Sequence, residues 1–572
     1  MQLTRHSRRW FPAFLIGILV FCGVRSAFAG EPSAAIERPR LIVIIIIDQF
    51  RGDYIQAFGD YFTEDGFKKL CREGAWFTNA LFDYGPTATG PGHASLSTGS
   101  TPAIHGIVGN NWEDLDEGGR GKYCCEDNGV RILGLPAGVE GDGRSPRNLK
   151  IATLGDQMKV ATDGRSQVWS VSIKDRAAVF TAGRQANGAV WWDNHTGNYV
   201  SSTYYFPTLP EWVAALNEAH IADAFFKKPW ERAAPASAYR VHLVSATRND
   251  DAWKRYHGND FPKILGRRSS EPDGEFYTDV YSSPFGNDVV LTAAKRAIEA
   301  QQLGTDEDPD LLNVCLSAND VVGHVYGPDS AEVMDCSIRT DAQLAEFLKW
   351  LDERVGLDQC IVAVAADHGV GSIPEYVNAL GLGGGRLKSG KVEDYVEERL
   401  RKRLGDPPAD RRYVDNIKFP WLWLDEETLR LAGVDVDRAA RAAAEIVHTY
   451  EGVNSAYAMK DILERSGSST SELERQIAKS YCPRRSGQVY IHWQRNWYTN
   501  GTAAGHGAAY EYDQHVPVII RGAGIRPGRY AERVCPTGLA ITLCKLLGID
   551  PPAGANGKVL ESCLAVEPLT AD

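Results

Sequence analysis

Residues 41–48 read LIVIIIID, seven consecutive apolar residues that end in an aspartate. A short run rich in β-branched residues is typical of a strand buried on both faces. Four further runs share this character, at Val168–Ile173, Leu311–Leu316, Ile361–Ala365 and Val516–Ile520. Helical stretches lie between some of them, at Asn287–Gln302 and Ser330–Leu351. The alternation predicts an α/β fold with a mostly parallel central sheet flanked by helices.

Polar side chains follow four of these runs at the point where each run ends. They are Asp48, Lys174, Asp320 and the pair Asp367 and His368. In open α/β sheets, ligands bind beyond the carboxyl ends of the strands. We therefore expect these side chains to gather at one edge of the sheet and to form a functional site there.

The first thirty residues have the pattern of an export signal. Three arginines precede an apolar run from Phe11 to about Val24, and Ala27-Phe28-Ala29 matches a small-x-small cleavage site. The run is shorter than the roughly 20 apolar residues that a membrane span needs. We expect a signal peptide at 1–29 that is cleaved near Ala29, a periplasmic or secreted protein, and no membrane span in the mature chain.

Two less regular blocks interrupt the alternation of strands and helices. Residues 185–285 are rich in Trp, Tyr, Asp and Pro, and residues 375–500 contain the glycine-rich stretch Gly381–Gly385. The second block also has charged helical stretches at Val392–Leu404 and Arg438–Tyr450. We expect both blocks to be insertions over the active edge of a single catalytic domain that spans 30–565.

The net charge restricts which partners the chain can bind. The formal net charge is −12 over 572 residues, and an acidic surface disfavours nonspecific binding of nucleic acid. Any site for phosphate must therefore be locally positive, and we expect a monomer that acts on small molecules.

Eleven cysteines are present, ten of them after Ala29. Export permits disulfides among the ten, while the absence of a C-x-x-C pair argues against a thiolate metal site.

The segment 87–111 reads TATGPGHASLSTGSTPAIHGIVGNN and offers several hydroxyl groups. Gly90–Gly92 is expected to form a turn, and His93–Thr98 is expected to open a helix. Backbone N–H groups at a helix N-terminus favour an anion, which makes Thr89 a candidate nucleophile. Thr87, Ser95 and Thr98 are rival hydroxyls, and the local chemistry does not choose among the four.

Three aspartates and three histidines are candidate metal ligands. They are Asp48, Asp320, His324, Asp367, His368 and His506. Asp320 and His324 are four residues apart, so a helix would place both on one face. The set is too large for one tetrahedral zinc with an open position, but it suits two zinc ions with three protein ligands each. Mixed Asp and His ligands also leave manganese open.

Six motifs occur along the chain in a set order. They are Asp48 after a strand, Thr89-Gly90-Pro91-Gly92-His93, His105-Gly106-Ile107 followed by Gly109-Asn110-Asn111-Trp112, Asp320-x-x-x-His324, Asp367-His368-Gly369 and His506-Gly507. This order resembles the alkaline phosphatase superfamily. The chain is most similar to the PafA-type phosphate monoesterases, whose relatives include the nucleotide pyrophosphatase/phosphodiesterases. The resemblance covers residues 40–550 and implies an alkaline-phosphatase-like core.

The resemblance implies a zinc-dependent phosphatase that hydrolyses phosphate monoesters through a phosphothreonine intermediate. It selects Thr89 as the nucleophile over its rivals. One zinc would be bound by Asp320, His324 and His506, and the other by Asp48, Asp367 and His368, with Thr89 bridging to it. Asn110 would contact a phosphoryl oxygen. Lys174 and Arg176 look like the Lys-x-Arg element of the monoesterase branch, whose substrates carry more negative charge than diesters.

Two alternatives stay open. The first is a phosphodiesterase or nucleotide pyrophosphatase of the same superfamily, and the second is a catalytically idle, exported metal-binding protein, which would not need the hydroxyl of Thr89. A sulfatase with a formylglycine nucleophile is disfavoured because the chain has no C-x-P-x-R motif. Asn319 departs from the small or hydroxyl residue expected before Asp320, which concerns the orientation of that ligand and not the ligand set.

Overall fold

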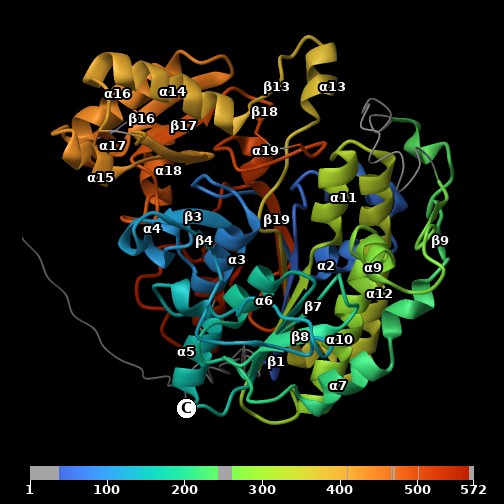
Figure 1. Cartoon of the computed structure of the whole chain (residues 1–572). Coiled ribbons are helices and arrows are strands. Elements are labelled where there is room, and N and C mark those ends of the chain that lie inside the picture. The colour runs from blue at the N-terminus through green and yellow to red at the C-terminus, as the bar shows by residue number, and fades with distance from the viewer. Residues whose placement is uncertain are drawn as a thin grey trace, which may run out of the picture. The chain divides into compact units, whose positions relative to one another are not determined.

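The computed structural model describes residues 38–241, 261–408, 410–465, 467, 471–499 and 501–565. The expected signal peptide at 1–29 lies outside these ranges. A ten-stranded sheet with the order β20-β2-β19-β12-β1-β11-β6-β7-β8-β5 forms the centre of the fold (Figure 1). Its strands are β1 (Leu41–Ile47), β2 (Ala75–Leu81), β5 (Ile132–Leu133), β6 (Val168–Ser172), β7 (Gly188–Trp192), β8 (Tyr199–Ser202), β11 (Asp310–Leu316), β12 (Cys360–Ala365), β19 (His515–Arg521) and β20 (Gly528–Tyr530).

The five apolar runs of the sequence are all strands of this sheet. The neighbours β12, β1, β11, β6 and β7 pair in parallel, whereas β19 pairs antiparallel with both β12 and β2. All seven residues of β1 are buried, as a strand in the middle of a sheet with helices packed on it requires. The helices α6 (Asp175–Ala182) and α10 (Phe285–Gln301) contact β6, β7 and β11. The predicted α/β fold with a mostly parallel sheet is confirmed.

The register of the parallel strands aligns their carboxyl ends. Ile47 of β1 pairs with Leu316 of β11, and Cys315 of β11 pairs with Ser172 of β6. The residues that follow these strands therefore emerge at one edge of the sheet. After β11, the chain enters α11 (Ala318–Tyr326) and then the long helix α12 (Ala331–Arg354).

The prediction of a turn at Gly90–Gly92 is wrong. Helix α3 runs over Thr89–Thr98, so it begins at Thr89 and includes the three residues. Pro91 fits there because the first turn of a helix does not use its N–H groups within the helix. The helix ends at Gly99, whose φ of +65° is readily adopted by glycine. The early start places the hydroxyl of Thr89 at the helix N-terminus itself.

The second irregular block contains a smaller sheet with its own apolar core. Its strands lie in the order β14 (Val414–Lys418), β15 (Trp421–Leu424), β17 (Val489–Trp493), β16 (Val453–Ala458). The helices expected there are α14 (Ser389–Leu404) and α16 (Val436–His448). Both helices contribute to an apolar cluster with these strands that is separate from the core of the main sheet.

Two expectations concern cysteines and membrane spans. The ten cysteines of the described residues are all free thiols, and eight of them are buried. Throughout the described ranges, no helix combines the length and the apolar character that crossing a membrane requires.

Candidate metal centre

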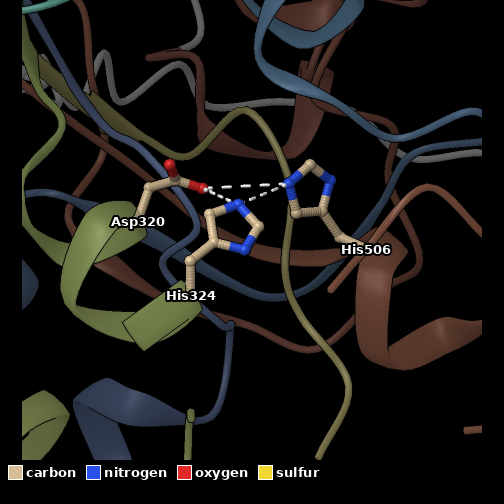
Figure 2. Close-up of side chains that lie close together, drawn as sticks. All are labelled: Asp320, His324 and His506. Carbon is tan, nitrogen blue, oxygen red and sulfur yellow. Dashed lines mark hydrogen bonds and ion pairs between the residues drawn. The ribbon is translucent and has the colours of Figure 1, made fainter. Parts of the chain in front are cut away.

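The first group of candidate ligands comes from α11 and from the loop that precedes α19 (Glu511–Gln514). Figure 2 shows Asp320, His324 and His506 converging. His324 Nε2 lies 3.3 Å from Asp320 Oδ1 and 3.3 Å from His506 Nε2, and His506 Nε2 lies 3.8 Å from Asp320 Oδ1. Ligand atoms about 2.0 Å from a tetrahedral zinc are separated by roughly 3.3 Å. The three side chains therefore lie close enough together to hold one metal ion.

The second group lies beside the first and shares Asp320 with it. Its atoms belong to Asp48, Asp320 and His368. His368 Nε2 lies 3.3 Å from Asp48 Oδ1, 3.5 Å from Asp367 Oδ2 and 4.0 Å from Asp320 Oδ1. The structure thus brings Asp367 close to this group, and it also places Asp320 between the two groups.

Buried polar atoms in the second group indicate that a cation fits there. Within the described residues, Asp48 Oδ1 and His368 Nε2 are buried and make no hydrogen bond, and Asp367 Oδ2, also buried without a hydrogen bond, lies 3.1 Å from His93 Nδ1 in an ion pair. A buried polar atom without a hydrogen-bond partner lowers stability. A divalent cation would satisfy all three atoms at once, so the residues present fit a metal ion.

Backbone carbonyls fix the orientation of the three histidines. Nδ1 lies 2.9 Å from Ala504 O in His324, 2.9 Å from Gly369 O in His368 and 2.7 Å from Thr87 O in His506. A carbonyl only accepts, so each Nδ1 carries a proton and each Nε2 faces the centre. Burial, together with His368 and His324, lowers the pKa of His506 well below its usual value, which favours a neutral ring.

Lys174 lies among the candidate ligands. Its Nζ donates to Asp48 Oδ2 over 2.6 Å and also to Asp320 Oδ2. Burial disfavours the charged amine, but the two carboxylates hold the pKa of Lys174 above its usual value. Burial also lowers the pKa of His368, but Asp367 and Asp48 raise it to about 9. The acidic cluster thus favours positive charge. The contact of Lys174 with a phosphoryl group stays a prediction.

Thr89 is the candidate hydroxyl that contacts a predicted catalytic residue. Arg176 Nη2 donates to Thr89 Oγ1 over 3.3 Å. Asn110 Oδ1 accepts a hydrogen bond of 2.8 Å from the N–H of Gly90, so the amide nitrogen of Asn110 can donate to another group.

The rival hydroxyls have other partners. Thr87 Oγ1 donates to Ala508 O over 3.4 Å, and Thr98 Oγ1 donates to Ala94 O over 2.6 Å. Ser95 Oγ lies 3.0 Å from Nε2 of His105. Each of these hydroxyls is thus tied to a group outside the candidate ligand set.

Gln49 is a functional candidate that sequence reasoning missed. Its N–H donates to Asp367 Oδ1 over 3.1 Å, and its Nε2 donates to Asp320 Oδ1 over 2.7 Å. The residue has a φ of +61°, a conformation that costs a residue with a side chain about 1–2 kcal/mol. Asn319 supports this turn, because its Nδ2 donates to Gln49 O over 3.0 Å. A glutamine after a strand carries no sequence signal, so only the fold identifies it.

His93 is the second residue without a predicted role. Its Nδ1 lies 2.9 Å from Thr89 O and 3.1 Å from Asp367 Oδ2. Burial lowers the pKa of His93, but Asp367 holds it well above the usual value. His93 therefore links the helix that carries Thr89 to a candidate metal ligand. Its place in the Thr89–His93 motif was the available signal.

Known proteins match this chain over most of its length. A family model described as type I phosphodiesterase/nucleotide pyrophosphatase matches residues 42–513. Alkaline phosphatase PhoV of Synechococcus elongatus is 35% identical over 92% of this chain and 94% of that protein. A Myroides odoratus protein named calcium-transporting ATPase is 32% identical over 94% and 97%. Alkaline phosphatase PafA of Elizabethkingia meningoseptica is 32% identical over 95% and 97%.

A solved structure matches as well. The crystal structure of wild type alkaline phosphatase PafA superposes with a TM-score of 0.83 at 30% identity, and the match covers 93% of this chain and 100% of that one. A PafA variant in which a threonine, an asparagine, a lysine and an arginine are replaced gives the same TM-score. The chain therefore belongs to the type I phosphodiesterase/nucleotide pyrophosphatase family, and its relatives within the alkaline phosphatase superfamily include PhoV and PafA.

Proposed function

We propose that the chain is an exported enzyme that hydrolyses phosphate monoesters with two zinc ions, through a phosphothreonine intermediate at Thr89. Two relatives named alkaline phosphatase support the reaction. The observation that carries the proposal is the position of the Thr89 hydroxyl. It receives a hydrogen bond from Arg176 and stands at the N-terminus of α3, on a helix that contacts Asp367 through His93.

The proposed metal ligands come from the two groups described above, with Asp367 in place of Asp320 in the second. Asp320, His324 and His506 would hold one zinc, and Asp48, Asp367 and His368 would hold the other. When bound, the two ions supply Lewis-acid charge that lowers the pKa of a hydroxyl and stabilises a leaving oxygen. The bonds from Nδ1 to backbone carbonyls keep the three histidine rings oriented for this task.

The remaining residues bind and orient the phosphoryl group. Thr89 Oγ1 attacks phosphorus in line as its proton leaves to solvent, the bond to the alcohol oxygen breaks, and the alcohol takes up a proton. Water then attacks the phosphothreonine, which releases phosphate and restores the hydroxyl. Arg176, Lys174 and Asn110 would hold the phosphoryl oxygens while their charge shifts.

Preference for monoesters over diesters is proposed from the two cations. A monoester dianion offers more charged oxygens than a diester. Lys174 caps α6 and contacts Asp48, and Arg176 lies in the first turn of α6 and contacts Thr89. The residue types replaced in the PafA variant match Thr89, Asn110, Lys174 and Arg176 in type and in order along the chain. This match supports the same four residues as the site here.

Export and domain organisation belong to the same proposal. The pattern of residues 1–29 supports cleavage near Ala29 and a periplasmic or secreted enzyme. We further propose that the mature chain acts as one catalytic domain and as a monomer, with the blocks at 185–285 and 375–500 as its insertions.

The test uses purified mature protein loaded with zinc. Mass spectrometry should find about two zinc ions per chain, as a two-metal site requires. Turnover of an aryl phosphate should exceed turnover of its methyl ester. A folded, active protein with one metal ion or none would contradict the metal proposal, and faster turnover of the methyl ester would favour the phosphodiesterase alternative.

A further inference from the structure

Arg176 is held by side chains to which none of the motifs above assigns a role. Its Nη1 donates to the hydroxyl of Tyr123 over 3.1 Å. That hydroxyl donates to Asp175 Oδ1 over 2.6 Å. Asp175 Oδ2 accepts a hydrogen bond of 2.6 Å from Arg144 Nε. A continuous network of hydrogen bonds thus runs from Arg144 through Asp175 and Tyr123 to Arg176.

The network is mostly shielded from water. The side chains of Arg144, Asp175 and Arg176 are 19%, 16% and 20% exposed. The guanidinium of Arg144 also lies 4.9 Å from the ring centroid of Tyr123. Burial raises the pKa of Asp175, but Arg144 and Arg176 hold it below its usual value, so the carboxylate stays charged between two cations. Hydrogen bonds to charged groups in such surroundings are stronger than neutral ones.

The geometry explains how Arg176 is aimed. A guanidinium is planar, so fixing one of its nitrogens restricts where the others point. Tyr123 fixes Nη1, and Nη2 then points at Thr89 Oγ1. Arg176 Nε is buried and has no hydrogen-bond partner among the described residues. The orientation of the Arg176 guanidinium toward Thr89 therefore depends on the hydroxyl of Tyr123. Asp175 in turn holds that hydroxyl by accepting its hydrogen bond.

One hairpin carries both Tyr123 and Asn110. Strands β3 (Asn111–Asp114) and β4 (Arg120–Tyr123) pair so that Asn111 lies opposite Tyr123. The N–H of Cys124 also donates to Asn110 O over 3.0 Å. The hairpin therefore fixes Asn110 directly and Arg176 through the hydroxyl of Tyr123.

We propose that Tyr123 and Asp175 are positioning residues for Arg176, and that they set how well the enzyme binds the phosphoryl group of a monoester in the transition state. The inference rests on the proposed function, in which Arg176 contacts that group. Neither residue touches substrate in this scheme, so their effect must pass through Arg176.

The decisive experiment is a double-mutant cycle. Tyr123→Phe removes the hydroxyl and keeps the ring that Arg144 covers. In the zinc-loaded enzyme it should lower kcat/KM for an aryl phosphate about tenfold, the scale of one hydrogen bond to a charged group. In an Arg176→Ala background the same change should lower kcat/KM less than about twofold, because the guanidinium that Tyr123 positions is absent. Asp175→Asn should behave like Tyr123→Phe in both backgrounds.

Two controls separate the possible outcomes. Tyr413→Phe removes the hydroxyl of a buried tyrosine next to β14 that donates to Gly405 O at the end of α14, and it should leave kcat/KM unchanged. Equal losses from Tyr123→Phe in both backgrounds, or no loss in the parent, would overturn the positioning role. If Arg176→Ala alone left monoester turnover intact, the proposed role of Arg176 would fail instead.

Discussion

Asp320 is the residue at which the two candidate metal sites meet. Its Oδ1 lies 3.3 Å from His324 Nε2 and 4.0 Å from His368 Nε2. The same oxygen accepts the side-chain hydrogen bond of Gln49, and Oδ2 pairs with Lys174. A change at this carboxylate therefore disturbs both groups. His506 is a candidate ligand only in the group drawn in Figure 2, and it touches the other group through the stacking of its ring on His368, with centroids 3.7 Å apart.

This difference predicts zinc content. His506→Ala should reduce bound zinc from about two ions per chain to about one, because it removes a ligand of a single site. Asp320→Ala should leave less than one, since it also removes the partner of Gln49 and Lys174. Mass spectrometry of the intact folded proteins measures both values. Equal zinc content in the two variants would show that the loss of Asp320 does not disturb the second site.

The hydroxyl of Thr89 gives a second prediction at this scale. Thr89→Ala should reduce turnover of an aryl phosphate at least about a thousandfold, as loss of a nucleophile does in other enzymes. Thr89→Ser should keep part of the activity because it keeps the oxygen. Thr98→Ala is the matched control, since that hydroxyl bonds to Ala94 O. A phosphate trapped on Thr87, Ser95 or Thr98 would identify a different nucleophile.

Helix α3 depends on a close approach to the β12 end of the sheet. A Cβ added at Gly92 would lie 2.3 Å from Asp367 O and 2.6 Å from Asp367 Cβ. No side chain fits at such distances without a shift of the backbone. The glycine therefore sets the distance between the helix that carries Thr89 and the candidate ligand Asp367.

The expected result of Gly92→Ala follows from that distance. Kcat/KM should fall roughly tenfold to a hundredfold, because a displacement of about 1 Å at a reacting group has an effect of this size. Gly390→Ala is the matched control, since a Cβ there meets nothing within 4 Å, and its activity should equal that of the parent. Steady-state kinetics and thermal unfolding measure both variants. An unchanged kcat/KM in Gly92→Ala would show that α3 tolerates the shift.

At the scale of the whole molecule, the sequence predicts what depends on burial and local spacing. The apolar runs identified β1, β6, β11, β12 and β19 because a strand buried on both faces reads as apolar throughout. A run that is apolar throughout does not indicate the direction of its strand relative to the neighbouring strands. Nothing in Val516–Ile520 therefore shows that β19 pairs antiparallel. The outer strands β5 and β20 have two and three residues, too few for a pattern.

The residues of the candidate site also differ in whether the sequence indicates them. Five of the six candidate ligands follow strands or stand at helical spacing, and the sequence indicates them. His506 lies in the loop before α19, and its signal is the His506-Gly507 motif. Gln49 and Tyr123 act through contacts with residues far along the chain, such as Tyr123 with Asp175, 52 residues away. Their residue types are common in loops and hairpins, so no local pattern marks them. Long-range side-chain contacts became visible only in the folded structure.

Protonation of His105 should couple the stability of the whole molecule to pH. The ring is buried, its Nε2 lies 3.0 Å from Ser95 Oγ, and its Nδ1 accepts from Ile107 N–H over 3.1 Å. Burial and Arg485 lower its pKa from 6.5 to about 3. Its contribution is therefore full above pH 6.5 and is lost as pH falls toward 3. Between pH 7 and pH 5, the loss should be about 2 kcal/mol of unfolding free energy.

Urea unfolding of the zinc-loaded parent and of His105→Gln at both pH values measures this loss. The parent should lose about 2 kcal/mol more than the variant. His195→Gln, at an 81% exposed side chain, should lose as much as the parent. An equal loss in parent and His105→Gln would mean that the buried ring does not govern this acid sensitivity.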